Sequence, residues 1–396
     1  MQLLKAEGEE SMHIGIVSPC SSAPLADLLP DSNGVDLGCG VYFIATLVRA
    51  LIGRGHRVSV VTLSSELAQP KILRGSQLTY YVYPMRPRRR MRDLYKFERQ
   101  GLREGIRLAK PDVVHAHWTY EFALACFESG LPTLVTSHDN AVRVLRFTTD
   151  PYRLGRLYLQ IRVVRNARFL TAVSPYLAKS LRWIARRKIP VIPNAIDIPR
   201  ESEIGSKAQG ASIRIATVLN GWGRLKNAKA AILAFNLVRR RSPGAEMFMY
   251  GDGYEARGQA SQWALSQGLT KNIYFCGFLP PQQLQTKLRE MSILLHPSLE
   301  EACPMAILEA MALGVPVVAG GGVGGVPWVL DNGKAGFLTN IRDPKRIAQA
   351  LLTCIEQTET RQERQRNAHD RVASLFSPNT VAEQYESLYE KALSSN

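Results

Sequence analysis

Residues 293–319 have the pattern of a strand, a loop, a helix and a second strand, and this order restricts the fold more than any other part of the chain. Residues 293–296 are a short apolar run typical of a buried parallel strand. Residues 305–313 are rich in strong helix formers and are followed by Gly314, which suits the end of a helix. Residues 315–319 return to strand character. Two strands joined through a helix predict a parallel α/β sheet.

Two glutamates, Glu301 and Glu309, lie eight positions apart in this unit. The first belongs to the loop and the second to the middle of the helix, about two turns further on. Carboxylates accept hydrogen bonds from sugar hydroxyls, while a helix N-terminus attracts an anion. An arbitrary pair of glutamates usually flanks an exposed helix. This helix lies between two apolar strands, so we expect both carboxylates to contact one extended ligand.

Short apolar runs alternate with helical segments in both halves of the chain. In the first half the runs are residues 13–18, 58–63, 112–115, 133–137, 169–173 and 191–193. In the second half they are residues 213–219, 247–250, 273–275, 293–296 and 315–319. This alternation predicts two doubly wound, Rossmann-like domains, whose ligands bind beyond the carboxyl ends of the strands. The polar residues 200–210 are the expected linker.

The composition excludes several classes of protein. With 396 residues, 45% of them hydrophobic, the chain can build two cores. No apolar run approaches the roughly 18–20 residues of a membrane span, and residues 1–10 are too acidic for a secretory signal. The six cysteines stand singly, without the paired spacing of zinc sites or redox couples. We therefore expect a globular protein of the cytoplasm.

The formal net charge of +16 favours an anionic partner. Basic residues crowd two segments, which contain Arg86, Arg88, Arg89, Arg90, Arg92, Lys96, Arg99, Arg103 and Arg107, and Arg143, Arg146, Arg153, Arg156, Arg162, Arg165 and Arg168. Apolar residues such as Phe97 and Tyr158 are interleaved with them, as on amphipathic helices that lie on anionic lipid. A solvated helical face explains the pattern equally well. No nucleic-acid-binding module accompanies the charge, so we expect no nucleic acid partner.

The stretch around Glu301 and Glu309 resembles the E-x7-E signature of the retaining nucleotide-sugar glycosyltransferases of family 4. The resemblance extends over nearly all of residues 12–393, with the motifs in the expected order. It implies the GT-B fold, in which two Rossmann-like domains face each other across a cleft. We expect an acceptor-side domain at residues 12–200 and a nucleotide-sugar-binding domain at 201–377. A C-terminal helix at 378–396 is expected to pack back on the first domain.

The resemblance also implies roles for the residues of the signature. The first glutamate, Glu301, would contact the transferred sugar, and Glu309 would hold the ribose of the nucleotide. The intervening donor-binding positions are Ala302, Cys303, Met305 and Ala306. Further along the donor, Gly277 and Phe278 match a family segment that runs beside the nucleobase, largely through backbone contacts.

Residues 219–227 follow a predicted strand and lead into a helix, where a basic side chain would neutralise a diphosphate. A solvated helix start is the simpler interpretation of such a basic pair. The family clamps the diphosphate with an arginine five or six residues before a lysine. Lys226 fits the lysine, but the arginine position falls at Asn220 or Gly221. Arg224 is the expected substitute.

Two motifs of the first half complete the predicted site. Gly38 and Gly40 lie between the first strand and a helix, where glycines allow backbone N–H groups to approach a phosphate, although an ordinary turn has the same pattern. They resemble the glycine-rich loop of family 4, interrupted here by Cys39. His138 matches the T-x-H position beside the transferred sugar. His117 belongs to an H-x-H-W segment that more often shapes the cleft.

The function implied by the resemblance is retaining transfer of a hexose from a UDP- or GDP-sugar to an acceptor hydroxyl. In the family mechanism the leaving diphosphate oxygen takes the acceptor proton. No Asp-x-Asp pair suited to a metal ends a predicted strand, and we expect no metal and no cofactor besides the nucleotide sugar. The expected acceptor is lipid-linked or a saccharide, in polysaccharide or glycolipid assembly at the inner face of the plasma membrane. The alternatives are a GT-B epimerase or hydrolase and a basic binding protein with a degenerate site.

Overall fold

The computed structural model describes residues 11–32, 35–199 and 212–395. The chain divides into two compact units. Unit 1 contains the described residues through Ala195 together with those from Pro378 onward, and unit 2 contains the described residues from Ile196 to Ser377. The linker expected at residues 200–210 and the segment 1–10 lie outside the described residues. The division thus falls a few residues before the expected boundary at 200.

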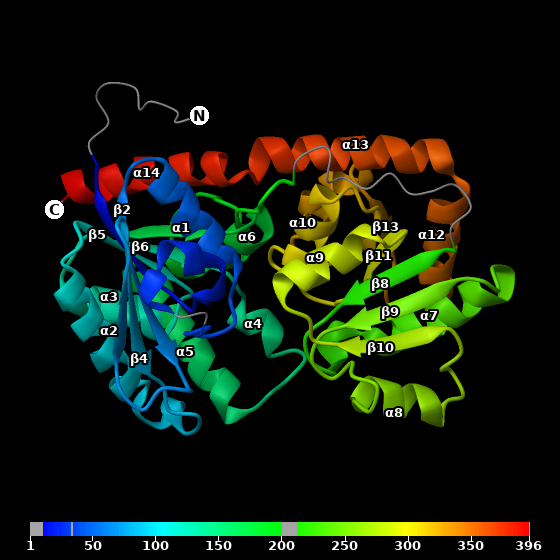
Figure 1. Cartoon of the computed structure of the whole chain (residues 1–396), viewed down its shortest axis with the longest axis horizontal. Helices are drawn as coiled ribbons and strands as arrows, with labels where there is room; N and C mark the ends of the chain where they lie inside the picture. The colour runs from blue at the N-terminus through cyan, green and yellow to red at the C-terminus, as the bar shows by residue number, and fades with distance from the viewer. Residues whose placement is uncertain (1–10, 33–34, 200–211, 396) are drawn as a thin grey trace. The chain divides into compact units, whose positions relative to one another are not determined.

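Unit 1 is built on a seven-stranded sheet (Figure 1). Its strands are β1 (His13–Val17), β2 (Arg57–Ser64), β3 (Lys71–Arg74), β4 (Leu78–Pro84), β5 (Val113–His117), β6 (Thr133–Ser137) and β7 (Phe169–Ala172). The spatial order is β3-β4-β2-β1-β5-β6-β7, and all neighbours are parallel except β3 and β4. The strand expected at residues 191–193 is wrong, because Val191 forms only an isolated bridge with Ala172.

Helices cover both faces of this sheet. They are α1 (Phe43–Gly53), α2 (Lys96–Ala109), α3 (Glu121–Ser129), α4 (Ala141–Val144), α5 (Pro151–Asn166), α6 (Pro175–Ala185) and α14 (Pro378–Ser394). Side chains alternate between the faces of a strand. On β4, Tyr80 and Val82 belong to the buried cluster that contains α1 and α14, whereas Tyr83 lies on the other face against Gly101 and Gly105 of α2.

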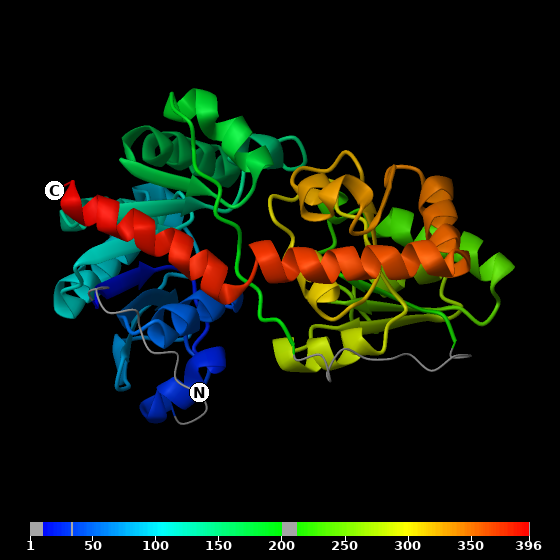
Figure 2. The same cartoon turned by 90° about the horizontal axis from the view of Figure 1, so that it is seen from above.

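Unit 2 is built on a six-stranded, fully parallel sheet. Its strands are β8 (Arg214–Val218), β9 (Glu246–Tyr250), β10 (Ile273–Gly277), β11 (Ile293–His296), β12 (Val317–Gly320) and β13 (Phe337–Thr339), in the order β10-β9-β8-β11-β12-β13. The helices are α7 (Ala228–Arg241), α8 (Gln259–Ser266), α9 (Pro281–Arg289), α10 (Met305–Ala312), α11 (Val326–Val329), α12 (Pro344–Glu356) and α13 (Thr358–Leu375). Figure 2 shows α13 lying along this unit, where it packs on α10 and α12.

The strand order of each sheet locates a ligand crevice. In unit 1 the order changes direction between β1 and β5, and in unit 2 between β8 and β11. Loops leaving the two strands at such a point diverge to opposite faces of the sheet and leave a crevice at its carboxyl edge. The residues after β5, β8 and β11 include most of the polar side chains singled out in the sequence. Among the helices that the structure describes, none is long and apolar enough to span a bilayer.

Candidate functional site

Two loops of unit 2 bring Lys226 and Glu301 together. Lys226 ends a short 3-10 helix, Arg224–Lys226, that follows β8, and its Nζ lies 3.0 Å from Oε1 of Glu301 in the loop after β11. Backbone contacts fix both loops, since the N–H of Leu299 donates to the carbonyl of Leu225 at 2.8 Å. Asn227 adds a clamp through Nδ2, which donates to the carbonyls of Pro297 and Ile341.

The environment of Glu301 keeps its carboxylate ionised. Burial by itself raises the pKa of Glu301, but the charge of Lys226 and the neighbouring His296 outweigh it and hold the pKa well below its usual range. His296 Nε2 lies 3.4 Å from Oε1. The carboxylate is therefore an acceptor at neutral pH, as the binding of sugar hydroxyls requires.

Several buried polar atoms around this pair lack a hydrogen-bond partner among the described residues. They are Oγ1 of Thr217, Nδ1 of His296 and Oγ of Ser298. Thr217 belongs to β8, while His296 and Ser298 lie at the end of β11, so all of them flank the crevice. Buried polar groups are normally hydrogen-bonded, and their grouping here suits a polar ligand. No sequence motif pointed to them.

Glu309 lies in the second turn of α10, half-buried, with no hydrogen bond or ion pair to its carboxylate in the part of the chain that the structure describes. Burial raises the pKa of Glu309 to about 7. Met305 and Ala306 form the first turn of this helix, whose N-terminus has no side-chain cap. Its backbone N–H groups are therefore available to an anion. Gly314 adopts φ +66° just past the helix, as expected for its end.

The remaining predicted donor residues occupy varied positions in unit 2. Arg224 is exposed, and its guanidinium makes no ion pair with any described residue. Gly221, at the position of the family arginine, has φ +83°, a conformation that favours glycine over arginine. Gly277 ends β10 with φ +70°, and Phe278 is 52% exposed beside it. Within the signature, Cys303 is buried and Ala302 half-buried.

A close backbone approach fixes Glu301 from its other side. The N–H of Gly325 donates to the carbonyl oxygen of Glu301 at 2.8 Å. A Cβ atom added at Gly324, which has φ +42°, would overlap the same carbonyl oxygen. Gly324 and Gly325, which follow β12, thus fix the backbone of Glu301 in the E-x7-E signature. The spacing of residues in the sequence did not reveal this role.

In unit 1, His138 follows β6 and is surrounded by other rings. Its Nε2 lies 2.8 Å from Nδ1 of His117, which ends β5. Trp118 stacks on it with a centroid distance of 4.3 Å, and Phe43 at the start of α1 approaches to 5.6 Å. Burial lowers the pKa of His138 to about 3, although a hydrogen bond with Asn194 opposes the shift. The ring is therefore neutral at physiological pH.

The two glycines of the first loop, Gly38 and Gly40, have different surroundings. Gly38 has φ +109°, forms an isolated bridge with Ser21, and leaves no room for a Cβ beside the carbonyl of Cys20. Packing on Cys20 thus explains Gly38 without a ligand. Nothing lies within 4 Å of a Cβ added at Gly40, so its backbone is open to a ligand. Gly40 also lies three positions before Phe43 and is thereby linked to the surroundings of His138.

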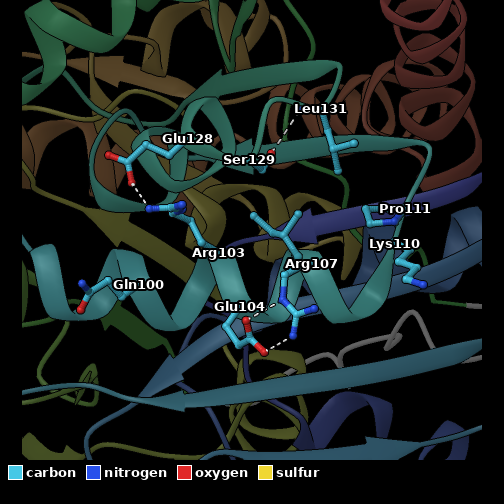
Figure 3. A pocket seen from close by; sticks show the side chains of 10 residues that line it. Gln100, Arg103, Glu104, Arg107, Lys110, Pro111, Glu128, Ser129 and Leu131 are labelled. Carbon is cyan, nitrogen blue, oxygen red and sulfur yellow. Dashed lines mark hydrogen bonds and ion pairs between the residues drawn. The ribbon is translucent and has the colours of Figure 1, made fainter.

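A hollow of about 590 Å³ in unit 1 lies at the opposite edge of the sheet (Figure 3). It is lined by residues that precede β5 and β6, including Lys110, Pro111 and Leu131. Its guanidinium groups pair with carboxylates, Arg107 with Glu104 at 2.6 Å. The hollow is therefore separate from the carboxyl edge. Within the described ranges, no cluster of histidine, cysteine and acidic side chains is suited to hold a metal ion.

Solved structures identify this architecture. Sucrose-phosphate synthase from Thermosynechococcus elongatus matches with a TM-score of 0.76 at 18% identity, over 97% of this chain and 100% of that one. HepE from Anabaena, solved in complex with UDP and glucose, matches with a TM-score of 0.67 at 20% identity, over 96% and 100% of the two chains. The protein has the GT-B fold, which confirms the expected fold class.

Two family models match the two halves of the chain. The model described as Glycosyltransferase Family 4 matches residues 40–200, and the model described as Glycosyl transferases group 1 matches residues 214–371. The chain belongs to glycosyltransferase family 4. It is a retaining glycosyltransferase that uses a nucleotide-sugar donor, as the E-x7-E resemblance implied.

Curated relatives share part of the sequence. A D-inositol 3-phosphate glycosyltransferase of Corynebacterium efficiens is 36% identical over 129 residues, which are 33% of this chain and 30% of the relative. The N-acetyl-alpha-D-glucosaminyl L-malate synthase of Bacillus anthracis is 24% identical over 300 residues, 71% of this chain and 75% of the relative. The first match thus spans under a third of its relative's length. The two relatives are named for different compounds.

Proposed function

We propose that this chain transfers a hexose from a UDP-sugar to a hydroxyl group, with the donor bound at the carboxyl edge of the six-stranded sheet. The observation that carries the proposal is the Lys226–Glu301 pair at 3.0 Å, with Glu309 in the second turn of α10, the helix that follows the Glu301 loop. The cation of Lys226 suits the diphosphate of such a donor. The carboxylate of Glu301 suits the hydroxyls of the sugar, and that of Glu309 suits the ribose. UDP is favoured because HepE, of the same fold, was solved with UDP-glucose.

Positive charge is the main chemical contribution of the site. As the donor's glycosidic bond breaks, charge develops on the departing diphosphate, and groups already aimed at it stabilise the transition state. Lys226, Arg224 and the N-terminal N–H groups of α10 supply that charge in our proposal. The acceptor oxygen attacks on the face from which the diphosphate leaves, and its proton passes to a diphosphate oxygen. No carboxylate base and no metal are then required.

The other residues orient the donor. Glu301 accepts hydrogen bonds from hydroxyls of the transferred sugar, and Glu309 accepts them from the ribose. The backbone around Cys303 and Met305 lies along the diphosphate, while Gly277 and Phe278 lie along the base. For unit 1, the family resemblance assigns His138 to the transferred sugar and the open backbone at Gly40 to the diphosphate.

We further propose that the acceptor is lipid-linked and that unit 1 rests on an anionic membrane. The two basic segments adjoin, since Met91 packs against Gly155 of α5 and the Tyr95 hydroxyl donates to that of Tyr152 at 3.3 Å. Exposed apolar side chains mark this surface, with Leu154 and Tyr158 each 53% exposed.

Charge on that surface is divided between paired and unpaired arginines. Arg86 is paired with Asp93 and Glu98, so its charge is neutralised inside unit 1. Arg88 and Arg92 are exposed and make no ion pair with any residue that the structure describes. Unpaired guanidinium groups beside exposed apolar side chains suit contact with anionic lipid headgroups.

A donor screen tests the catalytic proposal. Purified protein is mixed with UDP-, GDP- and ADP-sugars in the presence of a chelator, and thermal shift and nucleotide release are recorded. We expect a UDP-sugar alone to stabilise the protein and to be slowly hydrolysed. Lys226→Met should lower turnover by about 100-fold or more, by analogy with loss of one oxyanion donor. Lys229→Met, one turn further along, is the matched control and should keep wild-type turnover.

The contradicting outcomes are distinct. Response to a GDP-sugar alone would overturn the assignment of the donor and leave the site intact. No response to any donor, or equal losses in the Lys226 and Lys229 variants, would overturn the proposed site.

Vesicle flotation tests the membrane proposal. The protein should float with vesicles that contain phosphatidylglycerol and stay behind with pure phosphatidylcholine at about 0.15 M salt. Replacing Leu154 and Tyr158 by serine should abolish flotation, whereas serine at exposed Leu265 of unit 2 should not. Equal flotation with both lipids, or none with either, would contradict the proposal.

A further inference from the structure

The imidazole ring of His138 is held by several neighbouring side chains. Its imidazole is stacked on Trp118 at an interplanar angle of 26°, approached by Phe43, and joined through Nε2 to Nδ1 of His117 at 2.8 Å. Asn194, from the turn after β7 and α6, adds a further hydrogen bond. The ring therefore has contacts on its face and on its polar edge, and it cannot rotate without losing them.

The backbone of Trp118 adopts an unusual conformation. Its φ is +68°, in the left-handed region that bulky side chains rarely adopt. A hydrogen bond from its N–H to the carbonyl of Thr136, at 2.9 Å, fixes this conformation across β5 and β6. Such backbone strain persists where the surroundings determine it strongly, and it is concentrated at functional sites. Here the strained conformation places the indole against His138.

The bond between the two imidazoles constrains their protonation. A neutral histidine has one donor and one acceptor nitrogen, whereas a protonated one has two donors. The contact between His117 and His138 requires one donor and one acceptor, so the two rings cannot both be protonated. Burial lowers the pKa of His117 well below its usual range as well. One ring of the pair therefore donates and the other accepts, and Nε2 of His138 is engaged inside unit 1.

His117 is itself held by groups deeper in unit 1. The ring of His115 lies 4.1 Å from it on the same face of β5. His115 in turn is hydrogen-bonded to the hydroxyls of Thr136, at 2.7 Å, and Tyr389 of α14, at 2.8 Å. The titratable groups packed around the pair are thus His115 on β5 and Tyr385 and Tyr389 on α14, all buried.

We propose that His117 and Trp118 are positioning residues that keep His138 neutral and at one ring orientation, so that it meets the transferred sugar as a fixed group and not as a base. The inference rests on the proposed function, in which His138 contacts the sugar. It adds that the precision of this contact depends on two residues that never touch the donor.

Paired substitutions separate positioning from folding. His117→Asn places an amide nitrogen near the position of Nδ1 and keeps the contact with His138, while His117→Leu has similar size and no polar atom. We expect kcat of His117→Leu to fall by about 100-fold, as for a slightly misplaced catalytic group, with donor KM nearly unchanged. His117→Asn should retain most of the wild-type kcat. Trp118→Phe should behave like His117→Asn, and Trp118→Gly like His117→Leu.

The pH profile gives a readout that loss of packing alone would not produce. In the wild type, kcat at saturating donor should be flat from pH 8 to about pH 5.5, because His138 stays neutral and saturation removes the effect of Glu309 on donor affinity. In His117→Leu the ring is free to turn toward solvent, which relieves the burial that lowers its pKa. It should then titrate near its ordinary pKa of about 6.5, and kcat should fall below that pH. Histidine NMR titration of both proteins, with His138→Gln to assign the resonance, shows the same protonation without requiring activity.

Equal kcat and equal pH profiles in His117→Leu and His117→Asn would overturn the inference, as would a wild-type His138 that titrates near pH 6.5. A wild type that binds no nucleotide sugar would instead overturn the proposed function. The NMR titration would still decide whether His117 and Trp118 hold the ring neutral.

Discussion

At the scale of single residues, Glu309 is the carboxylate whose charge is least determined near neutral pH. Burial raises the pKa of its side chain to about 7, and none of the described residues offers it a partner. A carboxylate can accept two hydrogen bonds from ribose hydroxyls, but a protonated carboxyl group accepts them less well. Donor binding in the proposed site should therefore depend on the ionisation of Glu309.

We expect the affinity for UDP-glucose to rise with pH from 6 to 8 and then to level off. The sign follows from the site, because the ligand prefers the ionised form and lowers the pKa of Glu309, so binding releases a proton below pH 7. Titration calorimetry in buffers of different ionisation heat measures both affinity and proton release. Glu309→Gln should bind more weakly at pH 8 and lose the pH dependence. A variant with the wild-type slope would contradict the role of Glu309.

Individual residues of the site differ in how well the sequence predicts them. Glu301, Glu309 and Lys226 stand out because their spacing follows the strand-helix pattern. His296 and Asn194 do not, because their importance comes from neighbours far along the chain. The His-x-His spacing of β5 could have predicted that His115 and His117 share a face. No pattern in the sequence reveals the positive φ of Trp118.

At the scale of elements, the loop after β12 supports the signature through its backbone. Gly324 packs so closely on the carbonyl of Glu301 that a side chain has no room, and Gly325 donates to that oxygen. Gly322, two positions earlier, has open space around it and no positive φ. The two glycines therefore form a matched pair for substitution by alanine.

Gly324→Ala should lower both stability and turnover. The added methyl group must displace the Glu301 backbone or distort a left-handed residue, at a cost of about 1–3 kcal/mol. We expect the midpoint of thermal unfolding to fall by a few degrees, and kcat to fall more than the stability loss explains, because Glu301 moves away from Lys226. Gly322→Ala should match the wild type in both measurements. Equal behaviour of the two variants would show that the contact is unimportant.

The elements themselves were only partly predictable. The strand-helix-strand pattern at residues 293–319 predicts β11, α10 and β12 because apolar and helix-forming runs are separated there. β3 and β4 were missed, since these strands near one edge of the sheet are rich in polar and tyrosine residues and lack a uniform apolar run. Residues 191–193 are apolar but make only one bridge, because hydrophobicity alone does not ensure strand pairing.

At the scale of the whole molecule, the end of the chain completes the first unit. Helix α14 brings Glu386 to Arg54, whose Nε and Nη2 each lie 2.6 Å from a carboxylate oxygen, and to His56 Nε2 at 2.7 Å. Burial by itself raises the pKa of Glu386, but His56 and Arg54 outweigh it and lower the pKa to about 2. The contacts of Glu386 with Arg54 and His56 therefore link α14 to the end of α1.

Glu386→Gln should destabilise unit 1 at pH 7 by about 1.5–3 kcal/mol, the range of charge-assisted hydrogen bonds. A carboxylate with a lowered pKa stabilises the fold above its unfolded pKa, near 4.5, and this contribution is lost as pH falls toward 2. The difference from the wild type in urea unfolding should thus be constant above pH 5 and shrink below it. Glu383→Gln, exposed on the same helix, is the control. A difference independent of pH would contradict the ionic contribution of Glu386.

The two-domain organisation was predictable from alternating apolar runs, and the family from motifs in both halves. The residues that join α14 to unit 1 were not, because Arg54 and Glu386 are separated by most of the chain and neither belongs to a motif. The positive charge of the surface could be predicted from the amino-acid composition alone. Its division into paired and unpaired arginines required the structure, since the pairing of Arg86 depends on where Glu98 lies.

A crystal structure with UDP would test whether unit 2 binds a UDP-sugar through Lys226, Glu301 and Glu309. We predict the diphosphate within hydrogen-bonding distance of Lys226 Nζ and at the N-terminus of α10, with both ribose hydroxyls on the Glu309 carboxylate. UDP bound away from the ends of β8 and β11, for example in the basic hollow beside Arg103 and Lys110, would contradict this assignment of the donor site.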